Sequence, residues 1–169
     1  MANESIKKLT YGGLMTALVF VGTYLSRVPL ASGQAYIHAG DSMIFIAAIF
    51  LGWRYGAFAA GVGSALADIL LSYSVFAPYT FVIKAIMAII VARSVASSAK
   101  SLNPKSIVGM ILAGVWMVLA YQVPYYYLIK PDFNVNLLTI APFDALQAVT
   151  GIVVACAILA ALRKTKLFK

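Results

Sequence analysis

The chain has 169 residues, of which 63% are hydrophobic and 11% charged, and its mean hydropathy is +0.93. Soluble domains are about 45–50% apolar and about 25% charged, and a chain of this length cannot hide so much apolar side chain in one core. The composition therefore excludes a soluble globular protein and predicts a membrane protein.

The charged residues are few and are placed as in a membrane protein. The formal net charge is +8, from 13 Lys and Arg against 5 Asp and Glu. Apart from Lys84, each basic residue lies at the end of an apolar run or between two runs, which leaves no contiguous basic face for nucleic acid. The single cysteine, Cys156, excludes a disulfide or a thiolate metal site within one chain.

The apolar residues fall into six runs, each near the ~20 residues that a helix needs to cross a bilayer. The predicted transmembrane helices span 9–26, 36–52, 55–73, 75–95, 107–128 and 137–162. His38 and Asp41 occupy the start of the second run, so we expect that helix to be short, tilted or broken. No linker or repeat divides the chain, and the predicted fold is a single all-α membrane domain over residues 1–169.

The basic residues predict the orientation of these helices. With the N-terminus in the cytoplasm, two basic residues, Arg27 and Lys130, lie outside. Those that lie inside are Lys7, Lys8, Arg54, Arg93, Lys100, Lys105, Arg163, Lys164, Lys166 and Lys169. The positive-inside rule therefore predicts that both termini are cytoplasmic.

The polar residues within the predicted helices gather in one half of the membrane. This orientation places in the outer half His38, Asp41, Asp68, Lys84, the tyrosine run 125–127, Asp144 and Gln147. Ionisable side chains at membrane depth cost at least ~2.5–3.5 kcal/mol each unless they face a protein interior or a water-filled cavity. We therefore expect them to surround a site inside the bundle.

Asp68 continues a row of small residues on one helix face. Gly56, Ala60 and Ser64 precede it at spacings of four, and small residues let helices approach closely. Asp68 is therefore expected to point into the bundle. Two roles fit it, a structural ion pair with Lys84 and contact with a ligand, and we assign it structural support of the site.

Asp144 and Gln147 share one face of the last predicted helix. Asp144 fits either a favourable position at the positive end of the helix dipole or a ligand contact. Gln147 lies about 4.5 Å deeper along the helix axis, where it fits a ligand contact or an interhelical hydrogen bond.

The tyrosines and the single histidine have simpler interpretations. Most of the six tyrosines near the outer surface fit an interfacial aromatic belt, with one or two left to stack on a flat ligand; they are Tyr73, Tyr79, Tyr121, Tyr125, Tyr126 and Tyr127. No metal site is expected, because His38 has only Asp41 nearby as a second ligand. No motif predicts a catalytic site or a nucleotide-binding loop.

Several segments together carry a family resemblance. They are His38-Ala-Gly-Asp41, 46–52, 56–61, 63–68, Tyr73, Ala77-Pro-Tyr79 and Lys84. These segments resemble the substrate-binding S component of energy-coupling factor (ECF) transporters, in the branch with riboflavin-, pyridoxine- and hydroxymethylpyrimidine-type members. The similarity covers nearly the whole chain.

The resemblance implies a subunit of the prokaryotic plasma membrane that captures a vitamin from outside, without catalytic activity or a cofactor of its own. Its partners are then a coupling transmembrane subunit and two ATPase subunits. The family's docking motif, two alanines with three residues between them, matches Gly13 and Ala17, so glycine replaces one alanine. Packing of these residues within the chain's own bundle is the alternative.

The resemblance also implies a ligand pocket open to the outside. Relatives often carry Asn where this chain has Asp144, and the added negative charge favours a ligand with a basic ring nitrogen or an amino group. We expect a pyridoxine- or hydroxymethylpyrimidine-like heteroaromatic, with the 28–40 loop as its gate. The predicted ligand contacts are Lys84, Asp144, Gln147, Tyr125, Tyr126, Tyr79, His38 and Asp41. The alternatives are another B vitamin (riboflavin, folate or pantothenate), a stand-alone small transporter and a membrane enzyme.

Overall fold

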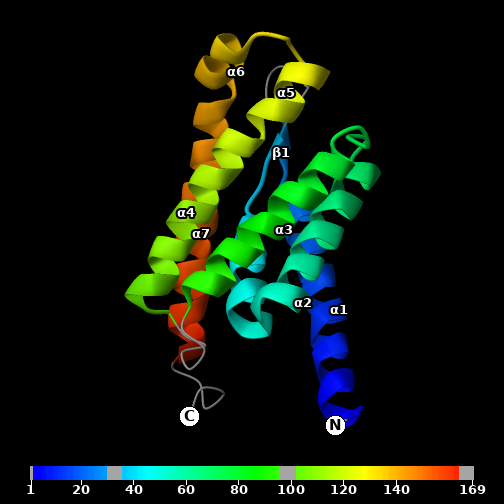
Figure 1. Ribbon diagram of the computed structural model, residues 1–169, viewed down its shortest axis with the longest axis vertical. Helices are drawn as coiled ribbons and strands as arrows, with labels where there is room; N and C mark the ends of the chain where they lie inside the picture. The colour runs from blue at the N-terminus through cyan, green and yellow to red at the C-terminus, as the bar shows by residue number, and fades with distance from the viewer. Residues whose placement is uncertain (1, 30–35, 96–101, 164–169) are drawn as a thin grey trace.

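The protein is a bundle of helices, and a computed structural model describes residues 2–29, 36–95 and 102–163. In chain order its elements are α1 (Ala2–Leu25), β1 (Val28–Pro29), β2 (Tyr36–Ile37), α2 (Asp41–Leu70), α3 (Ala77–Ser94), α4 (Pro104–Ala120), α5 (Gln122–Leu128), α6 (Phe133–Thr139) and α7 (Ala141–Arg163). The first turn of α1 and the last turn of α7 lie at one end of the molecule, which we call the terminal end (Figure 1). The opposite end, which carries α5 and α6, is called the distal end.

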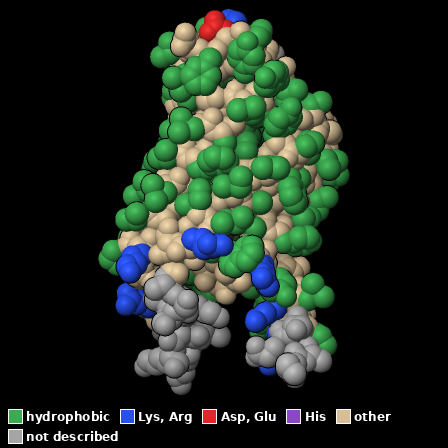
Figure 2. All heavy atoms as spheres, in the orientation of Figure 1, with side chains coloured by type: hydrophobic (Ala, Val, Ile, Leu, Met, Phe, Trp, Pro, Cys, Tyr) green, Lys and Arg blue, Asp and Glu red, His purple; other side chains and the backbone are tan. Residues whose placement is uncertain are grey.

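Four helical segments are long and apolar enough to cross a membrane: Asp41–Leu70, Ala77–Ser94, Pro104–Leu128 and Ala141–Arg163. Figure 2 shows apolar side chains along the height of the bundle and Lys and Arg gathered near the terminal end. This pattern is that of a protein surrounded by lipid. The count of six crossings and the cytoplasmic termini stay predictions, and Lys100, Lys164, Lys166 and Lys169 lie outside the described residues.

Helix α2 contains two of the predicted helices, joined by a sharp reversal at Gly52. The backbone of Gly52 has φ 72° and ψ −173°, a combination that only glycine adopts readily. A Cβ atom on Gly56 would lie 2.9 Å from Cα of Ala48, although eight residues of straight helix span about 12 Å. The chain therefore doubles back at Gly52, which confirms the predicted break between residues 52 and 55 (Figure 1).

Small residues bring the helices together at the core. A Cβ atom on Gly63 would lie 2.7 Å from the carbonyl oxygen of Thr16 in α1, and one on Gly61 would lie 3.0 Å from the Phe81 ring in α3. The predicted small-residue row ending at Asp68 is buried along its length. Close packing of α1, α2 and α3 thus confirms that Asp68 points into the bundle.

Three predicted helix boundaries are corrected. The second helix begins at Asp41 instead of residue 36, because Tyr36 and Ile37 pair with Pro29 and Val28 in a short antiparallel hairpin. The span predicted as 107–128 is divided into α4 and α5 near Tyr121, since Pro124 has no N–H for a helical hydrogen bond. The last predicted helix, 137–162, is likewise divided into α6 and α7.

Candidate ligand-binding site

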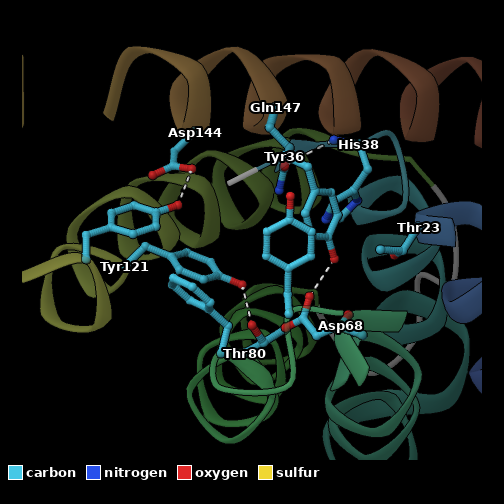
Figure 3. A pocket seen from close by; sticks show the side chains of 12 residues that line it. Thr23, Tyr36, His38, Asp68, Thr80, Tyr121, Asp144 and Gln147 are labelled. Atoms are coloured by element: carbon cyan, nitrogen blue, oxygen red, sulfur yellow. Dashed lines mark hydrogen bonds between the residues drawn. The ribbon is translucent and has the colours of Figure 1, made fainter. Parts of the chain in front are cut away.

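A pocket lies in the distal half of the bundle, between the β1–β2 hairpin and the ends of the long helices (Figure 3). Its cavity has a volume of about 40 Å³, smaller than the ~300–1,000 Å³ usual for small-molecule sites, so a vitamin-sized ligand requires the pocket walls to move apart. The side chains that line it are Thr23, Tyr36, His38, Ser64, Asp68, Tyr73, Phe76, Thr80, Tyr121, Tyr125, Asp144 and Gln147. They come from α1, β2, α2, α3, α5, α7 and the turns between them.

Aromatic rings form much of the pocket wall. The ring centroids of Tyr36 and Tyr73 lie 5.0 Å apart, and those of Tyr121 and Tyr125 lie 5.6 Å apart in a stacked arrangement. Phe76 joins the two pairs, with its ring 6.1 Å from that of Tyr125. Such a wall offers flat apolar faces to a planar ring.

Asp68 is a buried wall residue from the last turns of α2. Its Oδ1 accepts a hydrogen bond from the Tyr36 hydroxyl, whereas its Oδ2 has no hydrogen-bond partner among the described residues. Thr80 lies beside it on α3 and accepts a hydrogen bond from the Tyr121 hydroxyl at 3.1 Å (Figure 3). One oxygen of the Asp68 carboxylate is thus held by Tyr36, and the other is buried without a hydrogen bond among the described residues.

Asp144 repeats this arrangement in the first turn of α7. The Tyr125 hydroxyl donates to Asp144 Oδ1 at 3.0 Å, and Oδ2 has no partner among the described residues. The side chain is 5% exposed, so the unpartnered oxygen is buried against the pocket. Asp144 therefore lies inside the bundle and is no exposed helix cap.

The unpartnered polar atoms of the protein concentrate at this pocket. Within the described residues, such buried atoms are Thr23 Oγ1, Ser64 Oγ, Asp68 Oδ2, Gln122 Oε1 and Asp144 Oδ2, and all except that of Gln122 belong to pocket-lining residues. Buried polar groups almost always have hydrogen-bond partners. A polar ligand in the pocket would supply the missing ones.

Beneath the wall lies a fully connected polar cluster, which we call the base. Lys84 Nζ forms an ion pair with Asp41 Oδ1 at 2.6 Å, with both side chains 0% exposed. Gln147 Nε2 donates to Asp41 Oδ2 at 2.9 Å, and Gln147 Oε1 accepts from the His38 backbone N–H at 3.1 Å. The base thus ties α2, α3 and α7 to the strand that carries Tyr36.

Two titratable groups of the hairpin region are held in their neutral forms. Burial lowers the pKa of His38 from 6.5 to about 4, against the opposing effect of Asp41. Its Nδ1 accepts a hydrogen bond from the Gly40 N–H at 3.1 Å, so the neutral ring carries its hydrogen on Nε2. Burial, with the nearby Asp68, raises the pKa of the Tyr36 hydroxyl far above its usual value, and Tyr36 remains a hydrogen-bond donor.

The structure brings together four of the predicted ligand contacts at the pocket wall: His38, Tyr125, Asp144 and Gln147. Lys84 and Asp41 lie in the base, behind the wall. Tyr79 and Tyr126 do not line the pocket and are 36% and 40% exposed. Of the predicted 28–40 gate, residues 30–35 lie outside the described residues.

The predicted alternative of an Asp68–Lys84 ion pair is wrong. Lys84 pairs with Asp41 instead, and Asp68 is bound by Tyr36. The sequence analysis also missed Thr23, Tyr36 and Thr80 as wall residues, although the hydroxyl groups of Thr23 and Thr80 near the distal ends of α1 and α3 were a usable signal.

A second feature is the outward face of α1. Gly13 and Ala17 are exposed, and a Cβ atom on Gly13 would meet nothing within 4 Å. Gly12, by contrast, is buried and faces Tyr55 of α2. The neighbouring Gly12 therefore packs within the bundle, whereas no described residue covers the face that carries Gly13 and Ala17.

These observations define a multi-pass membrane protein with a pocket for a small molecule in one half of the bundle. A family model described as "ECF-type riboflavin transporter, S component" matches residues 3–164. The chain therefore belongs to this family of ECF transporter S components, which confirms the resemblance seen in the sequence. It is a substrate-binding subunit of a transporter and not an enzyme.

The chain is also similar to a solved structure and to a curated protein. A solved structure, "Structure and mechanism of the S component of a bacterial ECF transporter", matches with a TM-score of 0.73 at 20% identity, over 95% of this chain and 99% of that chain. It shows a shared fold. The chain is also 38% identical over 138 residues to the "Uncharacterized protein in gap 3'region" of Pyrococcus woesei, covering 80% of this chain and 88% of the relative.

Proposed function

We propose that this S component captures a small heteroaromatic vitamin or precursor of the pyridoxine or hydroxymethylpyrimidine type. The observation that carries the proposal is a pocket with an aromatic wall and two carboxylates that each have one unpartnered oxygen. The rings suit a planar heterocycle. The carboxylate oxygens suit its amino, hydroxymethyl or protonated ring-nitrogen donors.

Riboflavin is the second candidate, favoured by the description of the family model that matches the chain. Its fused rings also suit the aromatic wall, but they are larger and carry a long polyol chain. The two candidates therefore differ in size and are separated by a binding competition.

The proposal places the distal end of the bundle, and with it the mouth of the pocket, outside a prokaryotic plasma membrane. The support is the position of Lys7, Lys8 and Arg163 at the terminal end, where the positive-inside rule expects the cytoplasm. Loading from outside then follows from where the pocket lies along the bundle.

The proposed partners are a coupling transmembrane subunit and two ATPase subunits, with the exposed Gly13–Ala17 face as the docking surface. Small side chains on such a face let a second helix approach closely. Ala17→Leu is expected to abolish capture of the coupling subunit and to leave ligand binding unchanged. Val153→Leu on the exposed surface of α7 is the control, since that residue is 61% exposed and lies far along the chain from α1.

The test of the binding function is calorimetric titration of the purified chain in lipid nanodiscs. The ligands are pyridoxine, 4-amino-5-hydroxymethyl-2-methylpyrimidine, riboflavin, folate and pantothenate. We expect equimolar binding of one of the first two and no transport by the chain alone in vesicles. Preference for riboflavin establishes the second candidate, and transport by the chain alone contradicts the S-component mechanism.

A further inference from the structure

The two wall carboxylates, Asp68 and Asp144, have the same design although they come from different helices. In each, Oδ1 accepts a hydrogen bond from a tyrosine, Tyr36 or Tyr125. In each, Oδ2 is buried and has no partner among the described residues. Figure 3 shows them on opposite sides of the pocket, with aromatic rings between them and Tyr36 beside Asp68.

No cationic side chain of the described residues lines the pocket to balance these two acids. Lys84 is the nearest candidate, but its ammonium group is bound to Asp41 at 2.6 Å and contacts Met117 Sδ at 3.0 Å. His38 is held neutral by burial. The described part of the wall therefore has two acidic side chains and no cationic one to balance them.

From this geometry we propose that Asp68 is a ligand-binding residue and that Asp68 and Asp144 form a two-point acceptor site. The site takes a ligand with hydrogen-bond donors on two opposite edges, neutral or cationic, and rejects forms that carry a phosphate or a carboxylate. Tyr36 and Tyr125 are positioning residues that fix the direction of each free oxygen. This inference rests on the proposed function, because it specifies the chemistry of the same pocket.

The physical reason for rejection is charge. An anionic group brought into the pocket would meet two acidic side chains and no cationic side chain among the described lining residues, and a buried unpaired charge is strongly unfavourable. A ligand with a hydrogen-bond donor on each edge instead gives the unpartnered oxygen of each carboxylate a charge-assisted hydrogen bond. The transporter would then take up the free vitamin and leave its phosphorylated form outside.

The test compares each parent vitamin with its own phosphate ester: pyridoxine, hydroxymethylpyrimidine and riboflavin against their monophosphates. Calorimetry on the full chain in nanodiscs measures both affinities for the parent that binds. We expect the phosphate ester to bind at least about 100-fold more weakly, as expected for loss of charge-assisted bonds and added repulsion. Equal affinity for parent and ester overturns the inference and leaves the binding function intact. No binding of any parent contradicts the proposed function itself.

Charge-neutral variants separate electrostatic rejection from simple lack of space. Asp68→Asn and Asp144→Asn are each expected to weaken binding of the parent vitamin about 10- to 100-fold. Each is also expected to lower the ratio of parent affinity to phosphate-ester affinity about tenfold. Asp132→Asn is the matched control: it removes the same charge outside the pocket, and Asn can still cap α6, as Asp132 does through the Val135 N–H. Thermal unfolding of each variant checks its fold.

Two outcomes of the variant experiment overturn the assignment of Asp68. Unchanged parent affinity in a folded Asp68→Asn protein shows that Asp68 only supports the structure. An unchanged parent-to-phosphate ratio in both variants shows that the pocket excludes the ester by shape. If Asp68→Asn does not fold, Tyr36→Phe replaces it: this variant keeps the carboxylate but removes its positioning bond, and it is expected to lower parent affinity about fivefold.

Discussion

The carboxylates at the base of the pocket and at its wall differ in how many of their oxygens are hydrogen-bonded. At the base, Asp41 has both oxygens bound, one by Lys84 and the other by Gln147. At the wall, Asp68 and Asp144 each have one oxygen bound and one without a partner among the described residues. A carboxylate with both oxygens bound holds the bundle together, whereas a carboxylate with one unbound oxygen can still accept a hydrogen bond from a ligand.

The largest expected effect is at the base. Lys84→Met keeps the length of the side chain but leaves the Asp41 carboxylate buried without its cation. Breaking a buried ion pair on one side costs about 3–5 kcal/mol, and for a chain of this size that lowers the melting temperature by on the order of 10 °C. Thermal unfolding in detergent, followed by fluorescence, measures the shift.

The double variant Lys84→Met with Asp41→Leu is the control for that prediction. Removing both charges together is often nearly neutral, so most of the lost stability is expected to return. If Lys84→Met alone melts like the unaltered chain, the base does not have the structural role assigned to it.

The second effect is a loss of stability in acid from His38. Its pKa is about 4 in the folded chain and 6.5 without burial, so between these pH values the unfolded chain binds a proton that the folded chain does not. Stability is therefore full above pH ~6.5 and falls by up to about 3 kcal/mol as the pH drops toward ~4. The measurement is the difference in melting temperature between the original chain and His38→Gln across this range, and a constant difference contradicts the prediction.

A smaller effect is expected where a tyrosine holds a wall carboxylate. Tyr125→Phe removes the 3.0 Å hydrogen bond to Asp144 Oδ1 but keeps the ring in the aromatic wall. One such bond contributes about 1 kcal/mol, so ligand affinity should fall about fivefold. Calorimetric titration measures it, and a change as large as that of Asp144→Asn would show that Tyr125 itself binds the ligand.

The smallest effect is expected at Tyr126, the neighbour that the sequence also suggested as a ligand contact. Its side chain is 40% exposed and does not line the pocket. Tyr126→Phe should change ligand affinity less than about twofold, as surface substitutions usually do. The same titration checks this prediction, and a fall equal to that of Tyr125→Phe would move the ligand site toward the mouth of the pocket.

Much of the fold was predictable because a helix that crosses a bilayer needs ~20 mostly apolar residues in a row, and such runs are visible in the sequence. Apolar runs located the helices, and the break near Gly52 could be anticipated from the Trp53-Arg54 pair that follows the apolar stretch. The depth of the polar residues predicted Asp144, Gln147 and His38 at one site. Such patterns depend on one helix at a time, which is why they could be read without the structure.

The pairing of the buried charges could not be predicted in the same way. Sequence distance favoured Asp68 as the partner of Lys84, because a short turn joins their helices. The ion pair forms with Asp41 instead, because the reversal at Gly52 folds the two halves of α2 against each other and so brings the first half, which begins at Asp41, into the same bundle as α3. Tyr36 was missed because the hairpin that positions it depends on pairing with Val28 and Pro29, not on a local pattern.

The ligand-binding role of Asp68 and Asp144 is tested most directly by identifying the small molecule that the chain retains when it is purified from cells. Mass spectrometry of the released material is expected to find an intact, unphosphorylated heteroaromatic vitamin in equimolar amount, absent from the Asp68→Asn/Asp144→Asn double variant. A carboxylate-bearing or phosphorylated ligand, or the same ligand retained by the double variant, would contradict the ligand-binding role of the two wall carboxylates.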